Sequence, residues 1–129
     1  MSWQLYEKAR GLLSEEIGTI KKAFGGKISI ALCYPNTYQI GMSNLGFQKI
    51  YYLLNQYNDV LCERVFLPSP EDEIHFKKEN IPLFSIESQT PLHNFDILAF
   101  SVTFESDYIN ILKILNLSHI PIRSKDRNE

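Results

Sequence analysis

The residues best suited to binding a ligand gather in one stretch, residues 34–46, which reads Tyr-Pro-Asn-Thr-Tyr-Gln-Ile-Gly-Met-Ser-Asn-Leu-Gly. Side chains that donate or accept hydrogen bonds occur at Asn36, Thr37, Ser43 and Asn44. Gly41 and Gly46 allow a ligand to approach the backbone closely, and Tyr34 and Tyr38 offer flat apolar faces. The stretch shows no nucleophile–base pair, so its residue types favour binding by shape and hydrogen bonds.

This stretch lies between an expected strand, residues 28–34, and an expected amphipathic helix, residues 45–57. A strand followed by a polar turn and a helix is where an open α/β sheet usually binds its ligand. The turn has neither Gly-x-Gly-x-x-Gly nor Gly-Lys-Ser/Thr, so it is not a dinucleotide or P-loop signature. A second interpretation stays open, in which Ser43 or Asn44 merely caps the helix that follows.

Acidic and histidine side chains are further candidates for chemistry. The acids near expected strand ends are Glu63, Glu87, Glu105 and Asp107. Grouped carboxylates can bind a metal or act as general acid and base, but we expect surface acids, helix caps and, at Glu63-Arg64, simple ion pairs. The histidines lack metal-ligand spacing and are expected on the surface or in loops: His75, His93 and His119.

The two cysteines, Cys33 and Cys62, each lie in an apolar run that is expected to form a strand. We therefore expect both to be buried thiols that pack as small apolar side chains. No export signal accompanies them, so a disulfide is not expected. The absence of a Cys-x-x-Cys pair argues against a zinc, redox or iron–sulfur site built from this chain alone.

The elements that would position these residues follow from apolar periodicity and from helix start and stop signals. Helices are expected over residues 3–24, 45–57, 70–78 (capped by Ser69) and 107–117, the last with Tyr108, Ile111, Leu112 and Leu115 facing inward. Strands are expected over residues 28–34, 60–67, 82–87 and 97–103, and a charged tail over 123–129. This order predicts an α/β fold with an open, mostly parallel sheet and flanking helices, like the Rossmann and flavodoxin folds.

Length, composition and net charge restrict the class of protein to which the chain can belong. The chain has 129 residues, a net charge of -2 and 44% hydrophobic residues, which suits one soluble domain with a proper core. This charge argues against general binding of nucleic acids or anionic membranes. We see no membrane-spanning run and no secretory signal, and expect a cytoplasmic protein. We divide it into an N-terminal helical segment, residues 1–26, and an α/β domain, residues 27–129.

Longer motifs carry a family resemblance. They read A-L-C-Y-P-N-T-Y-Q-I-G-M-S-N-L-G, C-E-R-V-F-L-P, I-P-L-F-S-I-E-S-Q-T-P-L-H-N-F-D-I-L-A-F-S-V-T-F-E-S-D-Y-I-N-I-L and I-P-I-R-S. In unbroken order over roughly residues 27–127, they resemble the N-terminal region of radical S-adenosylmethionine (radical SAM) proteins. In that family a cobalamin-binding-like α/β domain precedes the radical domain.

The resemblance implies a 4Fe–4S cluster held by Cys-x-x-x-Cys-x-x-Cys, with S-adenosylmethionine on its open iron. This chain lacks the motif. The radical chemistry is therefore expected in a missing domain, and the chain alone is expected to be inactive. The family also continues into a further strand and a Gly-Gly turn, so the resemblance implies an α/β domain that is incomplete at its C-terminal side.

The resemblance also suggests cobalamin as a cofactor, held without a protein histidine. Proteins that ligate cobalt through histidine use Asp-x-His-x-x-Gly in the loop after the first strand, whereas here Tyr38 or Gln39 stands near that position. Ser101 resembles the serine near the nucleotide tail. The candidate ligand surface is Asn36, Thr37, Tyr38, Gly41, Met42, Ser43, Gly46, Ser101, Thr103 and Glu105.

Two other functions remain open at this point. The first is a degenerate docking or substrate-gating module that binds no corrinoid, which the missing histidine and Gly-Gly turn favour. The second is a small free-standing flavodoxin-like binder, against which the lack of a phosphate loop argues. The expected partners are the missing radical domain, a corrinoid and, through an unpaired sheet edge, a second copy of the chain.

Overall fold

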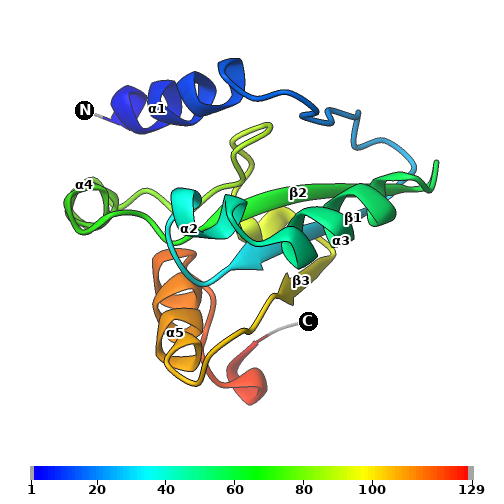
Figure 1. Ribbon diagram of the computed structural model, residues 1–129. Coiled ribbons are helices and arrows are strands. Elements are labelled where there is room, and N and C mark those ends of the chain that lie inside the picture. The colour runs from blue at the N-terminus through cyan, green and yellow to red at the C-terminus, as the bar shows by residue number, and fades with distance from the viewer. Residues whose placement is uncertain (1, 128–129) are drawn as a thin grey trace.

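The computed structural model describes residues 2–127, and its centre is a small parallel sheet (Figure 1). The three strands are β1 (Ile28–Tyr34), β2 (Val60–Phe66) and β3 (Ile97–Phe100). They lie in the order β2-β1-β3, and both strand pairs are parallel. The expected α/β class with an open, parallel sheet and flanking helices is therefore confirmed.

Helices flank the sheet because β1 is largely apolar on both faces and nearly all of β2 is buried. Every residue of β1 after Ile28 is buried, as is every residue of β2 after Val60. The helices are α1 (Ser2–Ser14), α2 (Tyr38–Met42), α3 (Leu45–Asn55), α4 (Pro70–Lys78) and α5 (Asp107–Leu117), with 3-10 turns η1 (Leu92–Asn94) and η2 (Ser124–Asp126). Helix α3 packs against β2, whereas α4 follows the carboxyl end of β2 and packs beside α1 and α5.

The starts of two helices agree with the sequence signals. Ser69 Oγ accepts a hydrogen bond from Asp72 N at 3.2 Å, and Pro70 is the first residue of α4. Asn44 Oδ1 accepts from Phe47 N at 2.9 Å and so caps α3. Each cap satisfies a backbone N–H group that the helix itself leaves without a partner.

The expected helix over residues 3–24 is wrong beyond Ser14, where α1 ends. Residues 15–27 form an irregular segment, here called the strap, in which Gly18 and Gly26 have positive φ angles of 95° and 73°. The strap follows the sheet because Lys22 Nζ donates to Asn55 O at 2.6 Å and to Val60 O at 2.9 Å. These tertiary hydrogen bonds favour the irregular conformation of the strap over the helix that the apolar periodicity predicts.

The expected strand over residues 82–87 is also wrong, because this segment makes only one isolated bridge within residues 2–127, between Phe84 and Pro91. Its backbone bonds go elsewhere, from Leu83 N to Leu117 O and from Ile86 N to Arg64 O. The strand expected over residues 97–103 ends earlier, at Phe100.

The prediction of which residues of α5 face the protein interior is partly wrong. Tyr108 and Leu112 are exposed, whereas Ile114 and Leu117 are buried beside Leu115. Asp107 at the start of the helix is also buried, and its carboxylate accepts hydrogen bonds from Thr103 N and Phe104 N. Helix α3 ends at Asn55, two residues before the expected end.

The division of the chain into a helical segment, residues 1–26, and an α/β domain, residues 27–129, stays a prediction. Residues 128–129 of the expected tail lie outside the described residues.

The outer edge of β2 is closed by groups from other parts of the chain. The Asn55 side chain accepts from Cys62 N and donates to Cys62 O, both at 3.0 Å. Further along, Arg64 N donates to Glu87 Oε1 and Arg64 O accepts from Ile86 N, both at 2.9 Å. Backbone groups that would otherwise recruit another strand are thus satisfied internally.

We predict that Asn55→Ala destabilises the fold by about 2–4 kcal/mol, because it leaves the buried N–H and C=O groups of Cys62 without partners. Urea denaturation would measure the change. Asn116→Ala is the control, since Asn116 is exposed on α5 and should shift stability by no more than about 0.5 kcal/mol. Equal stability losses in the two variants would contradict this role of Asn55.

Candidate functional site

The loop after β1 packs against the end of β2. Gly41 is buried, and a Cβ atom at this position would lie 2.4 Å from Phe66 Cε1 and 3.2 Å from Tyr34 Cγ. The absence of a side chain at Gly41 therefore serves packing of the chain on itself. Gly46 is exposed, and a Cβ atom there would meet only Asn44 Oδ1, at 3.2 Å.

Most polar side chains of this loop bond within the loop. Asn36 Oδ1 accepts from Thr37 N at 2.8 Å, and Ser43 Oγ donates to Gln39 O at 2.8 Å. The Met42 carbonyl accepts a hydrogen bond from the Gln48 side chain. The loop thus behaves largely as a well-satisfied connection whose Asn44 caps α3, which was the second interpretation of the sequence.

The loop after β3 lies beside the loop after β1, as expected for neighbouring parallel strands. Ser101 N donates to Cys33 O at 2.9 Å, and Asn110 Nδ2 donates to Pro35 O at 2.9 Å. Asp107 Oδ2 accepts from Thr103 N and from Phe104 N, both at 2.9 Å. The structure thus brings the two halves of the predicted surface close together and ties them with its own hydrogen bonds.

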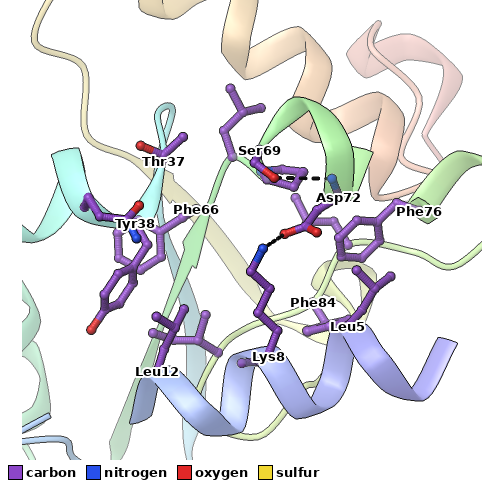
Figure 2. Close-up of a pocket in the computed structure, with 16 residues that line it drawn as sticks. Leu5, Lys8, Leu12, Thr37, Tyr38, Phe66, Ser69, Asp72, Phe76 and Phe84 are labelled. Carbon is purple, nitrogen blue, oxygen red and sulfur yellow. Dashed lines mark hydrogen bonds and ion pairs between the residues drawn. The ribbon is translucent and has the colours of Figure 1, made fainter. Parts of the chain in front are cut away.

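A cavity of about 220 Å³ opens at the carboxyl end of β2 (Figure 2). Of the ten candidate ligand residues, only Thr37 and Tyr38 line it. The other walls come from α1, α2, the end of β2 with the loop that follows it, α4 and the segment after α4: Leu5, Lys8, Ala9, Leu12, Gln39, Phe66, Leu67, Pro68, Ser69, Asp72, Phe76, Leu83, Phe84 and Ile86. Ser101, Thr103 and Glu105 do not line this cavity.

The strongest electrostatic feature is a buried arginine, Arg64. The ion pairs expected at Glu63-Arg64 are confirmed for Arg64, but the sequence interpretation missed its burial. Arg64 Nε donates to Glu87 Oε2 at 2.6 Å, and Arg64 Nη2 donates to Glu16 Oε1 at 2.7 Å. Its guanidinium carbon also lies 4.4 Å from the centre of the Tyr51 ring, a cation–π distance. The Tyr38 hydroxyl donates to Glu16, so the loop after β1 joins the same network.

Two carboxylates share this one guanidinium, and their pKa values move in opposite directions. Burial alone would raise the pKa of Glu16, but hydrogen bonds from Arg64, Thr19 and Tyr38 outweigh it and hold that pKa below the ordinary value. Burial raises the pKa of Glu87, and attraction to Arg64 offsets this only in part. Burial would lower the pKa of Arg64, but its two acidic partners hold it above the ordinary value, so the arginine stays charged.

The acids near the strand ends differ from expectation. Glu63 and Glu87 are buried, so their assignment as surface acids is wrong. Glu63 Oε1 accepts from Ser85 Oγ and Ser88 Oγ, both at 2.6 Å. Glu105 is exposed as expected, and Asp107 is a buried cap for the turn before α5.

Nothing within residues 2–127 forms a metal centre. No group of three or more His, Cys, Asp and Glu side chains there has an arrangement that would hold a metal ion. The histidines are exposed, and both cysteines are free and buried, as predicted. Burial raises the pKa of Cys33 and raises that of Cys62 to about 12, so both remain thiols.

Comparison with protein-family models shows to which family the chain belongs. The family model for the N-terminal region of radical SAM proteins matches residues 46–129. The chain belongs to this family. Searches of curated proteins and of solved structures found no match.

The match includes two members of the buried network, Arg64 and Glu87, and the loop after β3. It begins at Gly46, so α1, the strap with Glu16 and most of the loop after β1 precede it. No helix among the described residues of this radical SAM family member has the length and apolar character to cross a membrane.

We predict that Glu16→Gln lowers the free energy of unfolding by about 2–4 kcal/mol at pH 7, because it removes one partner of a buried guanidinium. The folded pKa of Glu16 lies below its unfolded value, near 4.5. Its contribution is therefore present above that value and lost as pH falls through the folded pKa.

Denaturant unfolding of both proteins at pH 7, 5 and 3 would test this, with the exposed neighbour variant Glu15→Gln as control. The difference between wild type and Glu16→Gln should stay constant down to about pH 5 and then shrink. A difference that persists undiminished at pH 3, or one that Glu15→Gln reproduces, would contradict the assigned role.

Proposed function

We propose that this chain is a docking module of a radical SAM protein, and that it packs against another protein domain through a surface formed by β3 and the start of α5. This β3–α5 surface comprises exposed apolar side chains from consecutive segments: Ile97, Val102, Phe104, Tyr108, Ile109 and Leu112. The radical domain is the partner that family membership favours. The chain itself would hold neither the cluster nor S-adenosylmethionine.

The observation that carries this proposal is the contrast between the two edges of the sheet. Side chains and a backbone amide close the outer edge of β2. By contrast, the backbone groups of β3 that face away from β1 have no hydrogen-bond partner among residues 2–127. An open edge beside exposed apolar side chains is a template for pairing with another polypeptide.

A groove of about 600 Å³ beside β3 supports the same role. Its apolar lining comes from η1, β3, the end of α5 and the residues that follow η1 and α5: Leu92, Phe95, Leu98, Phe100, Leu115, Ile120 and Pro121. Its polar lining consists of His93, Asp96, His119, Asp126 and Arg127. Protein–protein interfaces likewise combine apolar and polar side chains.

The cluster chemistry of the family does not fit the residues of this chain. An iron–sulfur cluster needs cysteine thiolates, whereas Cys33 and Cys62 are buried thiols with raised pKa values. The described residues also offer no group of metal-binding side chains. We therefore assign this chain a role in binding and positioning a partner.

Corrinoid binding is the second candidate. The order β2-β1-β3 puts the point where the strand order reverses between β1 and β3, and ligands of open α/β sheets bind at such points. The predicted surface lies in the two loops that flank this point. The described residues do not fit a corrinoid, however, because Phe66 fills the space beside Gly41 and Asn110 bonds Pro35 across the two loops.

The cavities lead to the same conclusion, because they measure about 220 and 600 Å³. Pockets for drug-sized ligands already reach roughly 300–1,000 Å³, and a corrinoid with its nucleotide tail is larger still. We therefore assign no reaction step to a corrinoid in this chain.

The docking proposal predicts concentration-dependent self-association of the isolated chain, because an open edge recruits copies when its partner is absent. Sedimentation velocity over a wide concentration range would measure it. Leu112→Lys on the β3–α5 surface should suppress the association, whereas Leu53→Lys on α3 should not. The two leucines are matched in exposure, at 45% and 46%. A monomer at every concentration would contradict the proposed surface, and so would equal suppression by the two lysine variants.

A titration with hydroxocobalamin, followed by visible absorbance and calorimetry, distinguishes the two candidate functions. Docking without a corrinoid predicts no saturable spectral change. Saturable binding at about micromolar affinity, equivalent to roughly -8 kcal/mol, would instead establish a corrinoid site. Gly41→Ala is then the control, since it crowds Phe66 and should weaken binding at the predicted loop.

A further inference from the structure

The cavity at the carboxyl end of β2 is separate from the β3–α5 surface and takes no part in the docking proposal. Its walls come from α1 on one side and from α4 and the end of β2 on the other (Figure 2). Carboxyl ends of parallel strands are the usual ligand edge of an α/β sheet. The cavity is therefore placed where this fold class binds small molecules.

The interior of the cavity suits an aromatic ring. Phe66, Phe76 and Phe84 line it, and aromatic rings pack favourably edge to face. Tyr38 and Phe66 already make such a contact here, with ring centres 5.1 Å apart, and the rings of Phe76 and Phe84 are tilted against each other with centres 5.4 Å apart. The volume of about 220 Å³ exceeds the roughly 150 Å³ of an engineered cavity that binds benzene.

The mouth of the cavity carries one positive and one negative group side by side. Lys8 Nζ on α1 lies 2.6 Å from Asp72 Oδ2 on α4, and Figure 2 shows the lysine reaching across to the aspartate. Their side chains are 58% and 20% exposed. An ion pair this exposed contributes little to stability, so a ligand that supplies both charges can replace it at little cost.

We propose that this cavity binds a free amino acid with an aromatic side chain. The ring occupies the apolar interior, the α-carboxylate pairs with Lys8 and the α-ammonium pairs with Asp72. A ligand with a single charge would satisfy one rim group and leave the other without its partner. A neutral aromatic molecule would use the interior alone, so the rim pair selects the zwitterion.

Isothermal titration of the full chain with L-phenylalanine tests this proposal, with 3-phenylpropionate, 2-phenylethylamine and benzyl alcohol as matched probes. We expect saturable binding of L-phenylalanine. Each singly charged analogue should bind at least about fivefold more weakly, the equivalent of losing one exposed ion pair.

Lys8→Gln should weaken L-phenylalanine binding about fivefold. Lys77→Gln is a closely matched control, because Lys77 pairs with Glu73 at 3.0 Å with the same side-chain exposures of 58% and 20%, yet neither residue lines the cavity. Leu12→Trp should fill the cavity and abolish binding while circular dichroism and thermal unfolding report an intact fold.

Three results would overturn the proposal. The first is the absence of saturable L-phenylalanine binding to the folded wild-type chain. The second is equal affinity for benzyl alcohol and L-phenylalanine, which would mean that the charges of Lys8 and Asp72 contribute nothing to ligand binding. The third is equal weakening by Lys8→Gln and Lys77→Gln, which would place the effect outside the rim.

Discussion

The burial of the Arg64 guanidinium is the constraint on which the rest of the structure depends. An isolated buried cation costs several kcal/mol, so it must be paired on every side that lacks water. Its partners come from places far apart in the chain, since Glu16 lies 48 residues before it and Glu87 lies 23 residues after it. The strap and the segment after α4 therefore have to meet at β2 for the fold to close.

This constraint explains why two local sequence signals do not decide the structure. Residues 15–24 have helical periodicity, yet Glu16 leaves the helix to reach Arg64. Residues 82–87 have the composition of a strand, yet Ile86 and Glu87 lie along the edge of β2 and satisfy Arg64. In both cases a buried charge with specific geometry outweighs a propensity that is worth less than a kcal/mol per residue.

The sequence predicted correctly those features that depend on residues close together in the chain. The positions of β1 and β2, the caps at Asn44 and Ser69 and the burial of both cysteines follow from apolar runs and from side chains that bond nearby amides. The cavity was harder to predict from the sequence, because only Thr37 and Tyr38 of the candidate ligand residues line it. Its other walls come from segments far apart in the chain, among them α1, the end of β2 and α4. A charged pair within the apolar run of β2, Glu63-Arg64, was the one signal that could have pointed to the buried network.

The unequal edges of the sheet also limit how large an assembly of this chain can become. A filament built by strand pairing needs two open edges on each subunit, one to receive a neighbour and one to offer to the next. Here the β2 edge is already occupied by Asn55, Ile86 and Glu87. Two copies that pair through β3 therefore use the same surface on both sides and form a closed, symmetric dimer, whose growth ends at two.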